Sequence, residues 1–283
     1  AWHFWRSART SSVGARTDIM DYSLTDIGAN LAHDSFDDDR DAVLQRAADA
    51  GVSRIVVTGS SDESNRKAAS LAQQHPGVLY ATAGMHPHHA SDYTDDSDAL
   101  IRTLAADRSI VAVGECGLDY FRNFSPRDAQ LSAFRAQLDI AAETGLPVFL
   151  HQRDAHDDFV EVLEPMLPKL SRAVAHCFTG EHESLREYLA MGLYIGVTGW
   201  ICDERRGTHL KEIVPIVPDD RLLIETDAPY LLPRTIQPKP KTRRNEPMYL
   251  PEVVRVVAEA RGQTEAHVAS ITTENAERFF GLG

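Results

Sequence analysis

Four side chains have the residue types and the placement expected of a metal centre. Glu115, His151, His176 and Asp227 each follow a short apolar run, in VAVGE, VFLH, AVAH and LLIETD. Imidazole suits Zn²⁺, Mn²⁺ and Fe²⁺, whereas carboxylate suits Mg²⁺ and Mn²⁺. Because an isolated buried charge is costly, four such groups together indicate metal ligands rather than separate core residues. A carboxylate can bridge two divalent cations, and a pair of cations can assist the in-line attack of a nucleophile on a phosphate.

Two further polar residues follow apolar runs of the same kind. His86 lies in GMHPHH, and Asp119 lies in GECGLD directly after Glu115. We expect His86 to contact substrate, although a His-Pro turn can also simply end a strand. Asp119 is expected to bind substrate or to orient a metal ligand through a hydrogen bond, and a place at the entry of a helix is the alternative.

A basic segment near the C-terminal end has the character of a phosphate-binding loop. Residues 234–244 read RTIQPKPKTRR and contain no acid, and their prolines should stiffen the segment. Clustered cations beside a metal would neutralise the phosphates of a nucleic acid strand, whereas the alternative is a solvated basic loop. The residues predicted to hold phosphates outside the scissile position are Arg205, Arg206, Arg243, Arg244 and Asn245.

Apolar runs and helical segments alternate eight times, which predicts a TIM (β/α)₈ barrel. Continuous apolar runs are typical of parallel strands buried on both faces. A doubly wound open sheet is the alternative, but the first run leads into DIGAN, which has no Gly-rich phosphate loop. The chemistry of a barrel lies at the C-terminal ends of its strands, where the residues above are placed. The expected strands are Leu24–Ile27, Arg54–Thr58, Leu79–Ala83, Ile110–Gly114, Pro147–Leu150, Ala173–Ala175, Leu193–Val197 and Leu222–Glu225.

Helical patterns fill the intervals between these runs. Arg40–Ala50 and Ala129–Thr144 are each followed by a glycine that can end a helix. Two more helices, Leu250–Arg261 and Glu265–Phe280, are expected to close the chain, with no linker that would divide it. We therefore expect one barrel domain over residues 20–283.

Composition places further limits on function. The 283 residues carry 29 Lys+Arg against 42 Asp+Glu, a formal net charge of −13. This acidity argues against whole-surface attraction to nucleic acid or to an anionic membrane, so a polyanionic substrate needs a local basic site. No run reaches the roughly 18 apolar residues that span a bilayer. The three cysteines, Cys116, Cys177 and Cys202, are read as structural thiols of a reducing compartment, and we expect a cytoplasmic monomer.

The first nineteen residues differ from the rest. They carry three arginines and one acid, Asp18, with aromatic residues and several serines and threonines. We interpret residues 1–19 as a non-native, mis-assigned or targeting-like extension and Met20 as the natural start. Without them the charge is 26 − 41 = −15, so the extension hides part of the acidity.

Several motifs, in order and spacing, resemble the TatD family of metal-dependent deoxyribonucleases. They are TDIGANL, TAGMHPH, GECGLDY, HQRDAHDDF, AHCFTG, LLIETDAPYLLPR and KPKTRRNEP, and they extend from about Leu24 to Phe280. The resemblance implies a TIM barrel that hydrolyses phosphodiesters with a divalent metal, acting as a 3′→5′ exonuclease on single-stranded DNA and RNA, with DNA repair or nucleic-acid degradation as its setting. Glu115, His151, His176 and Asp227 match the family's metal-binding positions, and His86 matches the GxHP histidine.

One departure from the wider family concerns a second cation. Many relatives have Asp-x-His-x-His after the first strand, whereas Gly28 and Asn30 stand at the two histidine positions here. Asp26 and Asn30 offer oxygens only, so a second ion, if it binds, should be a loosely held Mg²⁺ or Mn²⁺. We expect Mg²⁺ as the main cofactor, in one or two ions.

Two other functions remain open at this stage. One is an amidohydrolase or lactonase on the same barrel, for which His-x-His after the first strand would be typical. The other is a non-catalytic binding protein, which would have no need for a complete ligand set. In the catalytic interpretation, Glu115 holds the cation and Asp227 ligates or deprotonates the attacking water.

Overall fold

The computed structural model describes residues 23–282. Residues 1–19 and Met20, interpreted above as an extension and a start site, lie outside this range. Among the described residues, no helix combines the length and the apolar composition that crossing a bilayer requires.

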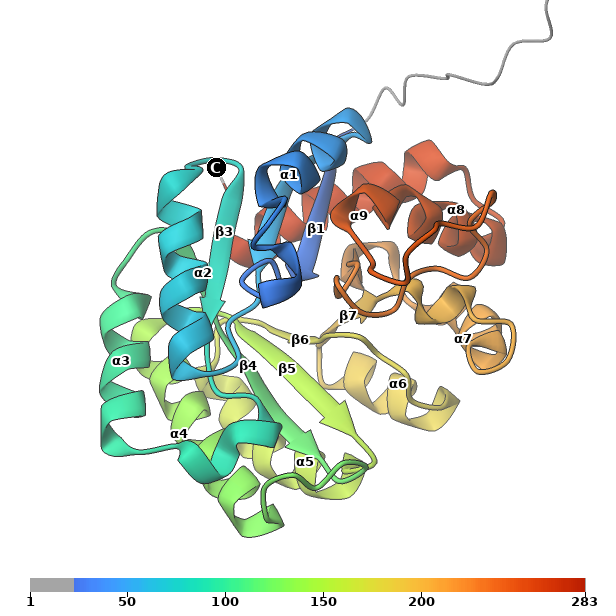
Figure 1. The fold of residues 1–283 in the computed structure, drawn as a ribbon. Coiled ribbons are helices and arrows are strands. Elements are labelled where there is room, and N and C mark those ends of the chain that lie inside the picture. The colour runs from blue at the N-terminus through green and yellow to red at the C-terminus, as the bar shows by residue number, and fades with distance from the viewer. Residues whose placement is uncertain (1–22, 283) are drawn as a thin grey trace, which may run out of the picture.

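Eight parallel strands form one sheet in the order β1 to β8, with helices outside them (Figure 1). The backbone beyond β8 closes the sheet onto β1, because Asp227 N donates to Gly28 O at 2.8 Å and Asn30 N donates to Ala228 O at 2.7 Å. The predicted TIM barrel is therefore confirmed. The strands are β1 Leu24–Ala29, β2 Val52–Val57, β3 Leu79–Ala83, β4 Ile110–Asp119, β5 Val148–Arg153, β6 Ala173–Ala175, β7 Tyr194–Val197 and β8 Leu222–Ile224.

Two strands that carry site residues run three or more residues past their predicted C-terminal ends. β4 continues past Gly114 to Asp119, and β5 continues past Leu150 to Arg153. Their pairing has an irregularity between Gly114 and Cys116. Gly114 has φ +137, and a Cβ there would lie 2.2 Å from Phe149 O. Only glycine fits this close approach. The residues after Gly114 include polar ones, so hydropathy alone does not predict that the strand continues.

The helices between strands follow the predicted alternation. α1 begins at Arg40, α4 ends before Gly145 in the left-handed conformation, and the last two helices have the predicted bounds. The α-helices are α1 Arg40–Asp49, α2 Asp62–Gln74, α3 Asp95–Ala105, α4 Arg127–Thr144, α5 His156–Leu163, α6 His182–Ala190, α7 Thr208–Ile213, α8 Leu250–Arg261 and α9 Glu265–Phe280. Short 3₁₀ helices are η1 Asp34–Phe36, η2 Pro87–Asp92, η3 Glu164–Lys169, η4 Gly199–Cys202, η5 Val214–Ile216, η6 Asp219–Arg221 and η7 Pro247–Tyr249.

Apolar side chains fill one end of the barrel and leave the other end to polar groups. Ile27, Phe149 and Leu223 are fully buried and belong to one cluster with Phe279 of α9. Because successive residues of a strand face opposite sides, Phe149 and His151 of β5 point the same way. The packed interior thus supports the polar residues that stand two positions further along the strands.

Candidate metal centre

Three imidazoles converge on one carboxylate oxygen inside the barrel. Glu115 Oε1 lies 2.8 Å from His176 Nε2, 3.0 Å from His151 Nδ1 and 3.3 Å from His86 Nε2. The glutamate comes from β4, and the histidines come from β5 and from the residues directly after β6 and β3. Sequence reasoning placed His86 with the substrate, whereas the structure brings it into this group.

This arrangement of donors fits a divalent cation. A neutral imidazole has one N–H donor and one acceptor nitrogen. Around a single carboxylate oxygen, a ring nitrogen that carries no proton has nothing to donate to that oxygen, but it can bind a cation instead. His151 Nε2 is buried without a hydrogen bond, although it lies 3.4 Å from Asp119 Oδ2. Ligand atoms of His86, Glu115 and His151 lie within 4.8 Å of one another, as a metal site requires.

The electrostatics of the group match its geometry. Burial alone would raise the pKa of Glu115, but the imidazoles of His176 and His86 outweigh burial and hold that pKa well below its usual range. Burial likewise disfavours a charged His176, yet Glu115 and Glu225 outweigh it and raise the pKa of that ring. The pKa of His86 falls to about 4, mainly through burial. The buried carboxylate of Glu115 and the ring of His176 therefore stabilise each other's charged forms.

Asp119 lies next to His151 and borders the cavity. Its Oδ2 is 2.8 Å from His88 Nε2 and 3.4 Å from His151 Nε2, and its Oδ1 accepts a hydrogen bond from Arg122 N at 2.8 Å. The side chain is 2% exposed, and both of its oxygens face groups of the protein. Of the predicted alternatives, the position favours the orientation of a metal ligand.

The sequence places Glu225 at the end of the eighth strand and does not single it out as a site residue. In the structure its carboxylate is fully buried next to His176. Its Oε2 lies 3.3 Å from His176 Nδ1, and its Oε1 accepts a hydrogen bond from Cys177 N at 2.5 Å. A Cβ on Gly28 would come within 2.4 Å of Oε2 and one on Gly196 within 2.6 Å of Oε1, so both glycines make room for it.

Asp227 faces the same cavity as the metal ligands. The cavity has a volume of about 810 Å³, and Asp227, Asn30 and Glu115 all line it. Asn30 Nδ2 donates to Asp227 Oδ1 at 3.0 Å, which fixes one carboxylate oxygen and leaves the other for a ligand or a water. Burial is the main reason that the pKa of Asp227 is raised to about 7.

The structure does not bring Asp26 to this cavity. Its side chain is fully buried, and its oxygens accept hydrogen bonds from Thr226 N at 2.9 Å and Thr226 Oγ1 at 2.5 Å. Burial raises the pKa of Asp26 to about 7. Asp26 thus joins β1 to the segment after β8 instead of lining the cavity. Asn30 lines the cavity and uses Nδ2 for Asp227, so its Oδ1 stays a candidate ligand for a second cation.

The cysteines divide into two kinds. Cys116 and Cys202 are buried, as expected of structural thiols. Cys177 was expected to point away from the site, but it has φ +44 and lines the cavity beside His176, with its Sγ 3.6 Å from Thr198 Oγ1. The left-handed conformation breaks the strand alternation on which that expectation rested.

Aromatic and basic side chains surround the mouth of the cavity. Phe121, Phe124 and Tyr230 line it and remain more than half exposed, at 54%, 68% and 52%. The guanidinium of Arg153 lies 4.0 Å from the ring centre of Phe121, and that of Arg206 lies 4.4 Å from the ring centre of Trp200. Exposed rings beside guanidinium groups are suited to bases and phosphates of a single strand.

The five residues predicted to hold phosphates have different positions. Arg205, Arg206 and Arg243 are exposed and line a second cavity beside the first, and Arg206 borders both cavities. Arg244 instead donates to Asp39 and Glu246, and Asn245 is fully buried, with Nδ2 donating to Thr226 O at 2.9 Å. These two side chains hold the fold of the segment, which leaves Arg205, Arg206 and Arg243 as the exposed candidates for phosphate contacts.

Comparison with known proteins settles the family. Residues 25–281 match the family model described as TatD related DNase. The chain belongs to this family. It is 53% identical over 259 residues to the protein named 3′-5′ ssDNA/RNA exonuclease TatD from Erwinia tasmaniensis, covering 92% of this chain and all of that one.

Solved structures of the TatD family share the fold. The TatD homologue YjjV of Escherichia coli K12 superposes with a TM-score of 0.83 at 30% identity, covering 91% of this chain and 98% of that one. A TatD family hydrolase from Entamoeba histolytica gives the same TM-score at 26% identity, covering 93% and 99% of the two chains. The chain is thus a nuclease of the TatD-related DNases, and its His/Glu group could hold the metal.

Proposed function

We propose that this TatD-related DNase removes nucleotides from the 3′ ends of single-stranded DNA and RNA with the help of bound Mg²⁺, or of Mn²⁺ in its place. The observation that carries this proposal is the convergence of His86, His151 and His176 on Glu115 at the bottom of a cavity with an aromatic and basic mouth. The name of the Erwinia tasmaniensis relative, 3′-5′ ssDNA/RNA exonuclease TatD, supports the same substrate class and polarity.

Glu115, His151 and His176 would hold one cation, and His86 would complete the group. The bound cation would supply a polarised scissile phosphate and a coordinated water of lowered pKa. Asp227, with one oxygen fixed by Asn30, is placed to take the proton of that water. Glu225 and Asp119 keep the rings of His176 and His151 in orientation.

The mouth of the cavity accounts for a preference for single strands. Phe121, Phe124 and Trp200 can stack only on bases whose faces are exposed. In a duplex the adjacent base pairs cover those faces, whereas in a single strand the bases are free to stack on the protein. Arg206 lies beside Trp200 and can bind the phosphate of the same nucleotide. We further propose that the enzyme works as a monomer in the cytoplasm, since the described residues already bring a complete group of ligands together.

The variant His151→Ala tests the metal assignment. We expect loss of metal-dependent cleavage by at least about 100-fold, because a ligand of the cation is removed. A 5′-labelled single-stranded oligonucleotide should be shortened stepwise from its 3′ end by the wild-type enzyme with Mg²⁺ and left intact with a chelator.

The control is His89→Ala, a neighbouring histidine of the same cavity that is outside the Glu115 group. Its activity should stay within a few-fold of wild type, and thermal melts should show both variants folded. Full turnover by folded His151→Ala would reject the ligand assignment, and release of internal fragments would reject the exonuclease polarity.

A further inference from the structure

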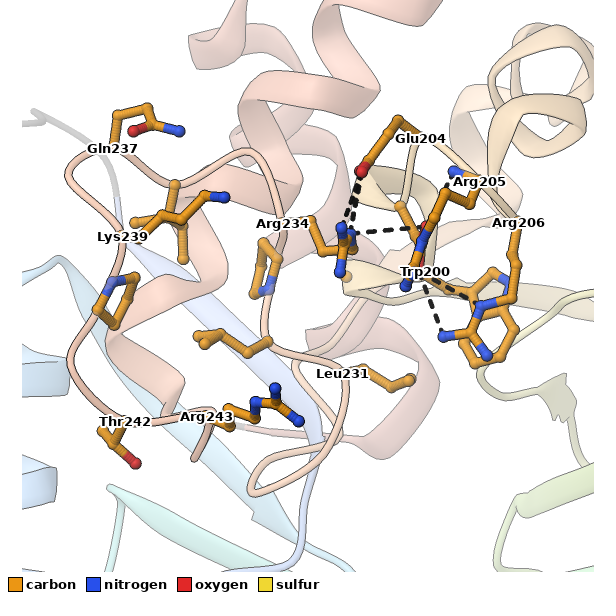
Figure 2. Close-up of a pocket in the computed structure, with 16 residues that line it drawn as sticks. Trp200, Glu204, Arg205, Arg206, Leu231, Arg234, Gln237, Lys239, Thr242 and Arg243 are labelled. Carbon is orange, nitrogen blue, oxygen red and sulfur yellow. Dashed lines mark hydrogen bonds and ion pairs between the residues drawn. The ribbon is translucent and has the colours of Figure 1, made fainter.

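A second cavity of about 690 Å³ lies beside the metal centre and is basic (Figure 2). It is formed by the segment between β7 and α7 and by the long segment between β8 and α8. Its cations are Arg205, Arg206, Arg234, Lys239 and Arg243, and its acids are Asp203 and Glu204, which gives 5 − 2 = +3. The whole chain has a net charge of −13, so this is a local reversal of sign.

The two acids of this cavity have different surroundings. Asp203 is buried, at 5% exposure, and accepts hydrogen bonds from Arg205 N and from the guanidinium of Arg206, so it shapes the loop. Its Oδ1 also lies 3.7 Å from Arg234 Nε, beyond hydrogen-bond distance, and so helps to keep Arg234 at the cavity. The side chain of Glu204 is 61% exposed, and its hydrogen bonds go to Arg234 alone, from Nε at 3.0 and 3.2 Å and from Nη2 at 2.8 Å. Figure 2 shows this pair at the edge of the cavity.

The Glu204–Arg234 pair has the geometry by which arginine binds a phosphate. Two nitrogens of a planar guanidinium meet two oxygens of an anion, as they would meet two oxygens of a phosphodiester. An exposed pair of this kind contributes little to stability, about 0–1 kcal/mol, so it can be exchanged for another anion at small cost. Lys239 and Arg243 are exposed and line the same cavity, so their charges are open to an incoming phosphate.

The basic cavity and the metal cavity are continuous. Trp200, Arg206 and Leu231 line both of them. An enzyme that removes nucleotides from a 3′ end needs room for one nucleotide on the 3′ side of the scissile bond, whereas the remaining strand must leave on the 5′ side. The basic cavity is a neighbouring space with the charge that such a strand needs.

We propose that the basic cavity binds the phosphates of the strand on the 5′ side of the scissile bond and that Glu204 is an internal competitor for Arg234, displaced when a long strand binds. This inference rests on the proposed exonuclease function. It predicts that the protein binds long strands more tightly than short ones. A trinucleotide held at the metal centre is too short to place phosphates in the basic cavity, whereas a longer strand can do so.

The test measures binding of 5′-fluorescein-labelled dT20 and dT3 by anisotropy, in EDTA so that no cleavage occurs. The ratio of the two dissociation constants, dT3 over dT20, reports the contribution of the basic cavity. We expect this ratio to fall about 5- to 10-fold in Arg234→Ala and in Lys239→Ala. In Glu204→Gln it should rise about 3- to 5-fold, because the competitor is gone.

Lys169→Ala is the matched control, since Lys169 is an exposed cation in η3, which precedes β6 and so lies toward the opposite end of the barrel. It should leave the ratio at the wild-type value. In the double variant Lys239→Ala/Arg243→Ala, the slope of log K for dT20 against log salt should become shallower by about 1.4, at about 0.7 per lost contact with a single strand.

The outcome separates this inference from the proposed function. Mg²⁺-dependent hydrolysis of bis(p-nitrophenyl) phosphate by the wild-type enzyme tests the metal centre without a strand. If that substrate is cleaved but the length ratio is unchanged in Arg234→Ala, or falls in Glu204→Gln, the basic cavity is not a strand-binding site. If neither that substrate nor any oligonucleotide is cleaved, the proposed function itself is overturned.

Discussion

At the scale of single residues, the centre is organised by two glutamates on opposite sides of one imidazole. His176 has Nε2 at 2.8 Å from Glu115 and Nδ1 at 3.3 Å from Glu225. An imidazole that binds a cation through one nitrogen needs its other N–H directed at an acceptor, and a carboxylate is the strongest neutral-pH acceptor for it. In the proposed metal centre, Glu225 would therefore set the tautomer and the ring orientation of His176, while Glu115 would face the cation.

The variant Glu225→Gln tests this positioning role. The amide keeps the size of the side chain but loses its charge, so His176 becomes a weaker ligand, and we expect metal affinity to fall about 10- to 100-fold. Metal titration by calorimetry should show the loss, and activity should recover in part at high Mg²⁺. A purely structural role predicts instead a lower melting temperature with unchanged metal affinity, and that result would reject the assignment.

Sequence reasoning could find the ligands but could not find this partner. Glu115, His151 and His176 stood out because each follows an apolar run, and the structure brings all three together. Glu225 also ends an apolar run, but Asp227, two residues later, was the residue assigned to the metal. The feature that distinguishes Glu225 is the space that Gly28 and Gly196 leave for its carboxylate. Both glycines are distant from it in the sequence and lie next to it only in the folded barrel.

At the scale of elements, the segment between β8 and α8 is anchored at one end and open at the other. Arg244 bonds both oxygens of Asp39 at 2.8 Å and Glu246 Oε1 at 2.8 Å, and Arg46 of α1 completes the network through Asp39 and Glu246. This network ties the segment to α1. Arg243, one position earlier, is exposed and lines the basic cavity.

The neighbouring arginines provide a matched pair of variants. Arg244→Ala breaks a part-buried network and leaves Arg46 as the remaining partner of Asp39 and Glu246, so we expect the free energy of unfolding to fall by about 1–3 kcal/mol. Arg243→Ala should change it by less than about 0.5 kcal/mol. Urea denaturation measures both, and equal effects of the two variants would contradict the division into an anchor and a phosphate-binding residue.

The sequence predicted the alternation of strands and helices well. It did not predict which arginine of the basic segment contacts the protein and which lines the cavity. Hydropathy determines where a buried strand must lie, which is why the last two helices agree with their predicted bounds. Two adjacent arginines have the same local sequence, however. Only the position of Asp39, more than two hundred residues away, separates Arg244 from Arg243, and that proximity arises from barrel closure.

At the scale of the whole molecule, a net negative charge is compatible with nucleic-acid binding because the acidic residues and the substrate-binding cations lie in different places. The net charge of −13 is spread over the chain, whereas the cations that serve the substrate gather in one cavity. Screening limits the reach of surface charge to about 8 Å at physiological salt, so a strand in the cavity meets the local +3 rather than the distant excess of acid. The same distribution leaves many carboxylates that must stay ionised for the fold to hold.

The acid stability of the molecule should depend on those carboxylates. The side-chain hydrogen bond from Arg244, opposed by burial and assisted by Arg46, lowers the pKa of Asp39 to about 2. An ordinary aspartate in the unfolded chain has a pKa of about 3.9. Because the folded-state pKa is the lower one, the stabilisation is complete above about pH 4 and is lost as the pH falls toward 2.

Asp39→Asn should therefore destabilise the protein at pH 7 and flatten the dependence of unfolding free energy on pH between about 4 and 2. Asp38→Asn removes the same charge from the neighbouring exposed position and serves as the control. Urea denaturation at pH 7, 4 and 3 should show the gap between Asp39→Asn and wild type narrowing as the pH falls, because the wild-type carboxylate becomes protonated as well. A gap that stays constant down to pH 3 would mean that the ionised Asp39–Arg244 pair does not carry this stability. A similar gap in Asp38→Asn would assign the effect to net charge instead of to the network that anchors the basic segment.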